Sequence, residues 1–353
     1  MPRPLEELRT ISPQRVCLIK PSALGDVVHT LPALSALREL WPKATISWVV
    51  NGSLRGLLDG HPDLDEVIPY ERRGAGFVGL ARFLSGLRGR RFDLTIDLQG
   101  LLRSGIMTAA TGAPIRLGAK DAREGASLAY SHVYDAARSN VHAVDRYLHA
   151  ASLFGADVSR PRFVVATDEA DREWARETLA HVPRPRLILN TGAQWLTKRW
   201  PPGHFAEVAR RAVSERGAGL IAVGAPGDRP LVDALREGLA PIPLLDLCGR
   251  TTLRQLAALA AESDLFVSND TGPLHLAVAA GARVVGIYTC TSPRLTGPYG
   301  PRAVTVQSCV WCAPSYVRTC QRLDCMNELG PDRVWPAVLA QLDSGRALAP
   351  TAA

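Results

Sequence analysis

The chain has 353 residues, of which 46% are hydrophobic and 21% charged, and its formal net charge is +7. This composition is typical of a globular protein, and the length allows two domains, each with its own core. No apolar run reaches the roughly 18 residues of a membrane span, and the N-terminal MPRPLEELRT lacks a signal peptide's apolar segment, so we expect a cytoplasmic protein. The charge favours an anionic partner: nucleic acid, a phosphorylated small molecule or a membrane surface.

Short apolar segments alternate with helical patterns through the first half of the chain. The predicted strands are Val16–Ile19, Thr45–Val50, Glu66–Pro69, Phe92–Leu98, Ile115–Leu117 and Phe163–Val165. Apolar residues recur at helical spacing from Val27 to Leu40, and His142–Phe154 has the pattern of a further helix. This alternation predicts a doubly wound parallel sheet.

The same alternation restarts after the charged amphipathic helix predicted at Asp168–Leu179 and a proline-rich break. Strands are predicted at Arg186–Asn190, Gly219–Val223, Leu244–Leu247, Leu265–Ser268 and Arg283–Tyr288, and helices at Phe205–Arg216 and Val334–Leu342. The Ala/Pro-rich end, Ala347–Ala353, is expected to fray. We therefore predict an α/β protein with two facing Rossmann-like domains, residues 1–167 and 168–345, and a cleft between them.

Two common nucleotide-binding fingerprints are missing from the sequence. Neither half carries G-x-G-x-x-G after its first strand, which argues against an NAD or FAD domain. The phosphate-binding G-x-x-x-x-G-K-[ST] is also absent. Two nucleotide-type domains without these motifs favour an enzyme that acts on a nucleotide sugar.

The stretch Leu265–Gly281 (LFVSNDTGPLHLAVAAG) predicts a buried strand, a polar turn and a helix. Such a helix start directs free N–H groups and a positive dipole end at a ligand, often a phosphate. Asp270 or Thr271 is suited to cap the helix, Gly272 allows a ligand close to the backbone, and His275 in the first turn can donate to a phosphate oxygen. The alternative is an ordinary capped helix in which His275 is a core residue.

Five motifs, in order, resemble those of the heptosyltransferases of glycosyltransferase family 9. They are KPSALGDVVHTLPAL (Lys20–Leu34), DLQGLLRS (Asp97–Ser104), NTGAQWLTKRWP (Asn190–Pro201), VGAPGDRP (Val223–Pro230) and SNDTGPLH (Ser268–His275). The resemblance covers about residues 15–340. It implies the two-domain glycosyltransferase fold called GT-B, and inverting transfer of a heptose from an ADP-heptose to a lipopolysaccharide-core acceptor. The donor would bind mainly the second domain and the acceptor the first.

The resemblance also implies roles for individual residues. Asp26 would deprotonate the acceptor hydroxyl, although an aspartate there is also suited to cap a helix. Lys198 would meet the donor phosphates, and Asp228 the ribose hydroxyls, with an N-cap role for Asp228 left open. The expected donor-binding residues are Gly25, Thr191, Gly192, Lys198, Asp228, Thr251, Asp270, Thr271, Gly272 and His275.

One motif departs from the pattern of the family's type I enzymes. Ala193 and Gln194 occupy places where adjacent threonines or serines bind phosphate, so the backbone, Thr191 or Thr197 would have to substitute. On the acceptor side the resemblance implies Gln99, Arg103 and Arg123.

The segment from residue 72 to residue 123 is strongly basic, with ten Lys/Arg against three Asp/Glu. That excess suits an anionic glycolipid, although a solvated basic surface would show the same excess.

Four cysteines, Cys309, Cys312, Cys320 and Cys325, lie within seventeen residues. Their spacing allows a structural zinc site, reduced thiols or disulfides, and we expect them to support the fold and not the chemistry. No carboxylate cluster indicates a catalytic Mg²⁺, so we expect no required cofactor and no catalytic metal.

These observations predict a cytoplasmic glycosyltransferase peripheral to the inner membrane. Its expected partners are an ADP-sugar, an anionic glycolipid and the cytoplasmic face of that membrane. One rival is a nucleotide-sugar epimerase of the same fold. A basic nucleic-acid-binding protein is the other, but no helix-turn-helix or stacking surface favours it, and we expect no nucleic acid partner.

Overall fold

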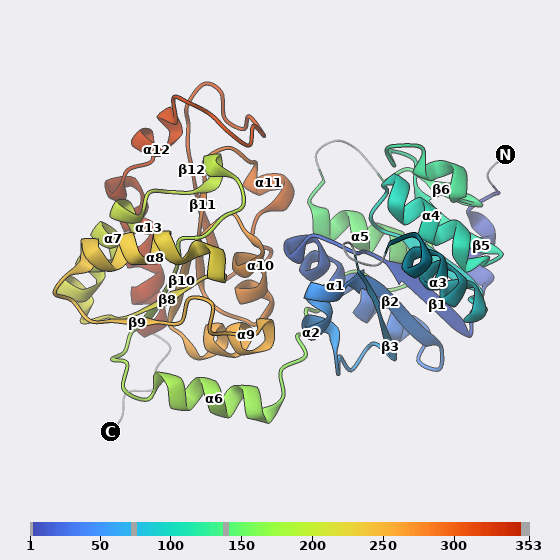
Figure 1. The fold of residues 1–353 in the computed structure, drawn as a ribbon, viewed down its shortest axis with the longest axis horizontal. Coiled ribbons are helices and arrows are strands. Elements are labelled where there is room, and N and C mark those ends of the chain that lie inside the picture. The colour runs from blue at the N-terminus through green and yellow to red at the C-terminus, as the bar shows by residue number, and fades with distance from the viewer. Residues whose placement is uncertain (1–2, 72–75, 137–140, 347–353) are drawn as a thin grey trace. The chain divides into compact units, whose positions relative to one another are not determined.

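The computed structural model describes residues 3–71, 76–136 and 141–346. The chain divides into two compact units that meet at Ala166 and Thr167. Figure 1 shows that each unit is a sheet with helices on both faces. We describe the two units separately below.

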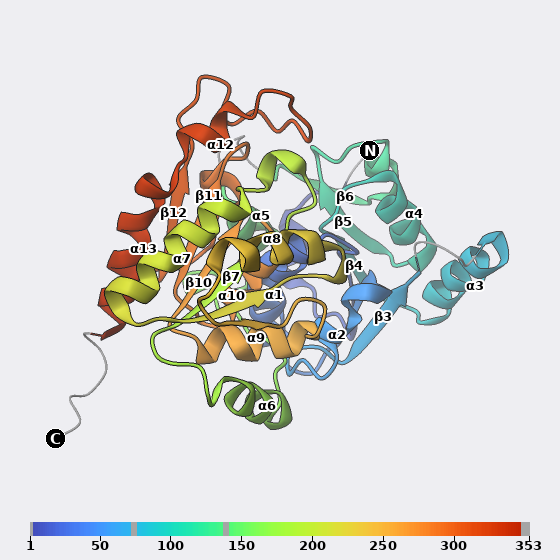
Figure 2. The same ribbon diagram turned by 60° about the vertical axis from the view of Figure 1, so that its left-hand side comes forward.

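Unit 1 is built on a parallel sheet. Its strands are β1 (Arg15–Ile19), β2 (Thr45–Asn51), β3 (Glu66–Tyr70), β4 (Leu94–Asp97), β5 (Ile115–Ala119) and β6 (His132–Tyr134). Its α-helices are α1 (Leu24–Leu40), α2 (Arg55–Leu58), α3 (Gly76–Gly89), α4 (Leu102–Thr111) and α5 (Ala143–Ser152). In the described residues the strand order is β3-β2-β1-β4-β5-β6. Helix α1 packs against α5, and α3 packs against α4 (Figures 1 and 2).

Unit 2 repeats this architecture. Its strands are β7 (Arg186–Asn190), β8 (Gly219–Val223), β9 (Leu244–Asp246), β10 (Leu265–Asn269), β11 (Val284–Tyr288) and β12 (Ala303–Gln307). Its α-helices are α6 (Glu169–Leu179), α7 (Pro202–Arg216), α8 (Arg229–Leu239), α9 (Leu253–Glu262), α10 (Gly272–Ala279), α11 (Pro293–Thr296), α12 (Asp324–Glu328) and α13 (Pro331–Arg346). In the part of the chain that the structure describes, the order is β12-β11-β10-β7-β8-β9. Helices α7, α8 and α13 cover one face with an apolar core, and α9 packs between α6 and α10.

The sequence predicts this α/β class correctly, and most strands lie within one or two residues of their expected bounds. One predicted strand is wrong: Phe163–Val165 is extended but pairs with no described strand. The strand that completes the first sheet is instead β6, whose three residues are too few for a periodic signal. The predicted fraying of Ala347–Ala353 lies outside the described residues.

The topology determines where functional groups collect. In each sheet the strand order reverses between two central strands, β1 and β4 in unit 1 and β7 and β10 in unit 2. Ligands of open α/β sheets bind beyond the carboxyl ends of strands at such switch points. The turns that follow these four strands contain four of the five motifs named above.

Candidate active site

In unit 1 Asp26 lies in the first turn of α1, which follows β1, and its carboxylate has three polar neighbours. One carboxylate oxygen accepts a hydrogen bond from the Ala23 backbone N–H (3.1 Å), so Asp26 does cap its helix. The other accepts from the Tyr147 hydroxyl of α5 (3.2 Å) and lies 3.9 Å from Nζ of Lys20. The Asp26 side chain nevertheless stays partly exposed, so capping does not prevent it from reaching a substrate.

Next to Asp26, Lys20 is buried and Tyr147 is half-buried. The Lys20 ammonium lies 4.8 Å from the centre of the Tyr147 ring, and burial lowers the pKa of Lys20 against the opposing effect of Asp26 and Asp97. Burial first, and then the Asp26 charge, raise the pKa of Tyr147 well above its usual value. Tyr147 therefore stays protonated and donates to Asp26 throughout the physiological pH range.

The three expected acceptor-side residues lie around the turns after β4 and β5. The Gln99 side-chain oxygen accepts from the Ser22 backbone N–H (3.3 Å), which ties this turn to that of Asp26. The Arg123 backbone N–H donates to the Gly100 carbonyl (2.9 Å), and the Arg103 guanidinium stacks 5.8 Å from the centre of the Tyr70 ring. Gln99, Arg103 and Arg123 thus belong to the same edge of the sheet as Asp26.

In unit 2 the turn between β10 and α10 is organised by the buried carboxylate of Asp270. Its oxygens lie 2.6 Å from Nζ of Lys198 and 3.6 Å from Nε2 of His275, and it accepts from the Thr291 hydroxyl (2.6 Å). Burial raises the pKa of Asp270, but hydrogen bonding from His275 and the charge of Lys198 outweigh it and hold the pKa well below its usual range. Asp270 is therefore an anion, and it holds the Lys198 ammonium and the His275 ring in position.

The expected side-chain cap of α10 is not formed. Thr271 occupies the N-cap position, but its hydroxyl accepts from the Asn190 amide (3.1 Å) and makes no bond to the first turn. Asp270 is engaged by Lys198 and His275, so it does not cap the helix either. The prediction that one of these two residues caps α10 is wrong. As a result, the first-turn N–H groups around Gly272 remain available to an anion.

Lys198 ends a short turn, Leu196–Lys198, that leaves β7. Its ammonium lies 4.7 Å from the centre of the Trp195 ring, and Arg318 lies over the same ring at 5.3 Å. The turn is anchored by Thr197, whose hydroxyl donates to the Val317 carbonyl (2.5 Å). Because Thr197 is used in this way, it cannot replace the missing phosphate-binding hydroxyls.

Thr191 is better suited to that role. Its carbonyl accepts from Asn269 (2.9 Å), but its buried hydroxyl has no hydrogen-bond partner among the described residues. A buried unsatisfied hydroxyl costs about 1–3 kcal/mol unless a ligand or water completes it. This unused donor lies at the end of β7, beside the Asn269 end of β10.

Gly192 and Asp228 are in direct contact, although they follow different strands. A Cβ at Gly192 would collide with the Asp228 carboxylate. That carboxylate accepts from the Ala225 backbone N–H (2.9 Å) at the start of the 3-10 turn Pro226–Asp228 and stays partly exposed. Asp228 also occupies the N-cap position of α8, but its side chain makes no capping hydrogen bond there.

Thr251 and Gly25 are the two remaining residues of the expected donor set. Thr251 directly precedes Thr252, which caps α9 through Gln255, and the preceding Gly249 hydrogen-bonds to the turn of Asp228. Gly25 opens α1 beside Asp26 and so belongs to unit 1, whereas the other expected donor residues belong to unit 2.

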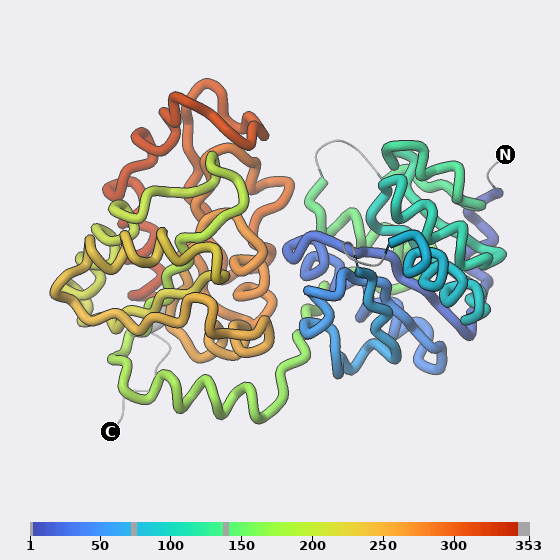
Figure 3. Tube along the Cα trace, viewed as in Figure 1, coloured from blue at the N-terminus to red at the C-terminus, as the bar shows by residue number. Residues whose placement is uncertain are grey.

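The structure gives no support for a metal site at the four cysteines. Among the described residues no group of three or more His, Cys, Asp or Glu is arranged to hold a metal ion, so the zinc interpretation is not supported. All four are free thiols, three of them exposed and Cys325 half-buried. Figure 3 shows their segment as an irregular excursion after β12. It packs against the Lys198 turn through Val317 and Arg318.

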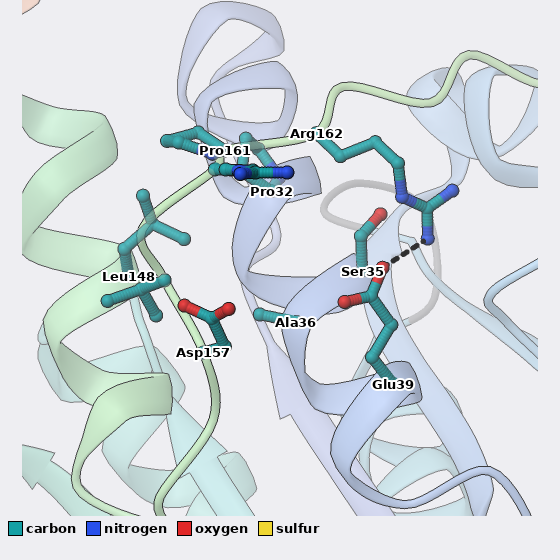
Figure 4. Close-up of a pocket in the computed structure, with 10 residues that line it drawn as sticks. Pro32, Ser35, Ala36, Glu39, Leu148, Asp157, Pro161 and Arg162 are labelled. Carbon is teal, nitrogen blue, oxygen red and sulfur yellow. Dashed lines mark ion pairs between the residues drawn. The ribbon is translucent and has the colours of Figure 1, made fainter.

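A small hollow of unit 1, shown in Figure 4, lies away from these residues. It is bounded by α1, α5 and the segment through Asp157 and Arg162, and Arg162 pairs there with Glu39 (3.2 Å). Its lining contains none of the expected site residues, so it plays no part in the site.

Sequence reasoning missed the partners that hold the site residues. Tyr147 and Thr291 lie outside every motif, and nothing in their local sequence links them to Asp26 or Asp270. Only the fold brings them together.

Two Rossmann-like units with polar groups at each switch point define a GT-B type α/β enzyme. Residues 80–325 match glycosyltransferase family 9 (heptosyltransferase). Lipopolysaccharide heptosyltransferase 1 of Pseudomonas aeruginosa is 34% identical, with 87% of each chain covered. The chain therefore belongs to glycosyltransferase family 9, and it is a glycosyltransferase.

Solved structures share this fold. A family 9 glycosyltransferase from Veillonella parvula has a TM-score of 0.80 at 23% identity, covering 94% of this chain and 98% of its own. The E. coli heptosyltransferase WaaC, solved with ADP, has a TM-score of 0.73 at 25% identity, covering 93% and 99%. Within the described residues, no helix is long and apolar enough to cross a membrane.

Proposed function

We propose that this enzyme transfers a heptose from an ADP-heptose to the core of a lipopolysaccharide, with inversion at the anomeric carbon. The relatives' names support the sugar and the acceptor, and the ADP in the E. coli structure supports the nucleotide. One observation carries the donor half: Lys198 and His275 are held by Asp270 at an uncapped helix start, next to the unused hydroxyl of Thr191.

The donor's diphosphate is the ligand that best fits these groups at the start of α10. The α10 N–H groups, Lys198 and His275 supply positive charge and donors, and Thr191 supplies a hydroxyl in place of those missing at Ala193 and Gln194. The Asp228 carboxylate accepts from the ribose hydroxyls, and Gly192 leaves room for it. Thr251 and Gly25 enter the donor set on the resemblance alone.

The reaction is a direct displacement. Asp26 takes the proton of the acceptor hydroxyl, whose oxygen forms a bond to the anomeric carbon while the bond from that carbon to the phosphate oxygen breaks. ADP leaves with the bonding electron pair, and Lys198, His275 and the α10 dipole stabilise its added charge. Gln99, Arg103 and Arg123 bind the acceptor, whose phosphate or carboxylate groups suit the two arginines.

Because the acceptor is anchored by its lipid in the inner membrane, the enzyme acts at the cytoplasmic face of that membrane as a peripheral protein. The nearest alternative with this fold, a nucleotide-sugar epimerase, would need no acceptor.

The test has two stages. Thermal shifts with ADP, UDP, GDP and CMP should single out ADP, and mass spectrometry should detect one added heptose on a heptose-free core acceptor. His275→Ala is expected to weaken ADP binding by about ten- to a hundredfold, the value of one charge-assisted hydrogen bond, with the fold intact. Turnover of ADP-heptose to an isomer without acceptor would refute the proposal.

A further inference from the structure

Unit 1 exposes large apolar side chains on three neighbouring elements. They are Phe77 and Val78 of α3, Leu102 and Ile106 of α4, and Leu128 of the 3-10 turn Ala126–Ala129. We call these five residues the apolar rim. Phe77 and Leu128 are both 93% exposed, which is nearly the exposure of an unfolded chain. Exposed apolar groups that cluster in this way mark an interaction surface.

The rim residues face the same side of unit 1. Helices α3 and α4 lie side by side over one face of the sheet, where Leu87 and Met107 enter a common core (Figures 1 and 2). Their opposite stripes therefore both point outward. On α4 that outward stripe is Leu102, Ile106 and Ala109, which has no polar member. The turn of Leu128 packs on α4, with Ala126 against Gly105.

The rim lies toward one end of this face. Phe77, Val78 and Leu102 belong to the first turns of their helices, which follow the carboxyl ends of β3 and β4. The same edge of the sheet carries Asp26, Gln99 and Arg103. The apolar rim therefore borders the residues proposed to meet the acceptor.

The charged residues of α3 and α4 favour an anionic partner. Arg82, Arg88 and Arg103 are the charged residues of α3 and α4, and neither helix has an Asp or Glu. Arg82 follows Phe77 and Val78 on the outward face of α3. Apolar side chains beside arginines, on helices that themselves carry no carboxylate, are the composition of a surface that lies on an anionic bilayer. Glu124, whose carboxylate accepts from the Leu102 backbone N–H (3.2 Å), is an acidic neighbour of the rim, but it belongs to neither helix.

We propose that the apolar rim and Arg82 form the membrane-contact surface of this enzyme, which inserts Phe77 and Val78 among anionic lipids. This deepens the proposed function, since a lipid-anchored acceptor would then reach Gln99 and Arg103 from the bilayer. The contact itself requires only phospholipid.

The experiment is co-sedimentation of the full chain with vesicles. Wild type is expected to bind phosphatidylglycerol-containing vesicles, to bind pure phosphatidylcholine less, and to lose affinity in high salt. The double variant Phe77→Ser/Val78→Ser should bind roughly tenfold or more weaker. Arg82→Glu should weaken binding to the anionic vesicles alone. Because all three positions are exposed, melting temperatures should stay at the wild-type value.

Trp311→Ser is the matched control. Trp311 of unit 2 is as exposed as the rim residues, but it lies in the irregular segment that contains the cysteines. The control variant should bind vesicles as wild type does. The surface assignment is overturned if wild type binds no vesicles, or if Trp311→Ser weakens binding as much as the double variant. It is also overturned if the double variant only dissociates a dimer of wild type.

A soluble core oligosaccharide without lipid separates this inference from the proposed function. The double variant should glycosylate that acceptor at the wild-type rate. Vesicle binding without any sugar transfer by wild type would refute the function and leave the surface standing. Transfer to the soluble acceptor without vesicle binding would support the function and refute the membrane-contact surface.

Discussion

The two switch points of this enzyme use the same pair of residue types in opposite ways. In unit 1 the lysine is buried and the carboxylate reaches solvent, with 4% of the Lys20 side chain exposed against 40% for Asp26. In unit 2 the carboxylate is buried and the lysine is more accessible, with 5% for Asp270 against 19% for Lys198. Under the proposed function, the exposed partner is the group that meets the ligand: a base in unit 1 and a cation in unit 2.

This inversion explains why similar strand-turn-helix units can serve opposite halves of one reaction. A buried partner acts as a support, since it fixes the position and charge of the exposed one. The predictions below test which residue of each pair acts on the substrate and which acts as its support.

The largest effect is expected at Asp26. Asp26→Asn keeps the side-chain shape but removes the basicity, and general-base assistance contributes about 10²–10⁴ in rate. Transfer should fall by about that factor, while ADP affinity, measured by calorimetry, stays at the wild-type value. A variant that still transfers heptose at nearly the wild-type rate would show that Asp26 is not the base. His29, which lies one turn further along α1, is buried and packs edge-on against His142, so it would need to move to take over.

Asp270 should matter mainly for stability. Asp270→Asn leaves Lys198 and His275 without their anion, and removing one member of a buried pair costs about 3–5 kcal/mol. Because Lys198 can turn partly to water, we expect about 2–4 kcal/mol in urea unfolding at pH 7.

The stabilisation by Asp270 should depend on pH. The folded pKa of Asp270 lies below the unfolded value of about 3.9, so its stabilisation is complete above about pH 5 and is lost as the pH falls. The difference between wild type and Asp270→Asn should therefore shrink from pH 7 to pH 3. A constant difference over that range would mean that the charge of Asp270 does not stabilise the fold.

Lys198 should affect nucleotide binding in unit 2 more than the general-base step of Asp26 in unit 1. Lys198→Gln removes the accessible cation of the pair, and ADP affinity should fall about ten- to a hundredfold. AMP, which lacks the second phosphate, should lose less. Equal losses for ADP and AMP would indicate that Lys198 supports Asp270 and does not contact the diphosphate.

The smallest effect is expected at Tyr147. Tyr147→Phe removes one hydrogen bond to the Asp26 carboxylate. At 3.2 Å this bond is long for an O–H···O contact, so we expect it to contribute only about 0.5–1.5 kcal/mol and transfer to slow about two- to tenfold. If Tyr147 positions Asp26, the effect should disappear in the Asp26→Asn background. Additive losses in the double variant would instead mean that Tyr147 acts on its own.

The sequence predicts the two sheets because their strands are short, buried and apolar, and it predicts the turns because the motifs follow those strands directly. It does not predict β6, whose three residues are held by pairing with β5, or β12, which pairs with β11. Nor does it predict the pairing of Lys198 with Asp270, since the two are distant in the sequence and meet only when β7 pairs with β10. The capping error at Thr271 has the same cause, because Asn190 of the neighbouring strand occupies its hydroxyl.

The contact between Gly192 and Asp228 has a consequence for how this enzyme can change. Any side chain at position 192 would displace the carboxylate at 228, which would then have to leave its place beside the Ala225 N–H. The two positions therefore form one unit of variation. A library that aims at another nucleotide should randomise both together, because a change at position 192 also moves the carboxylate at 228.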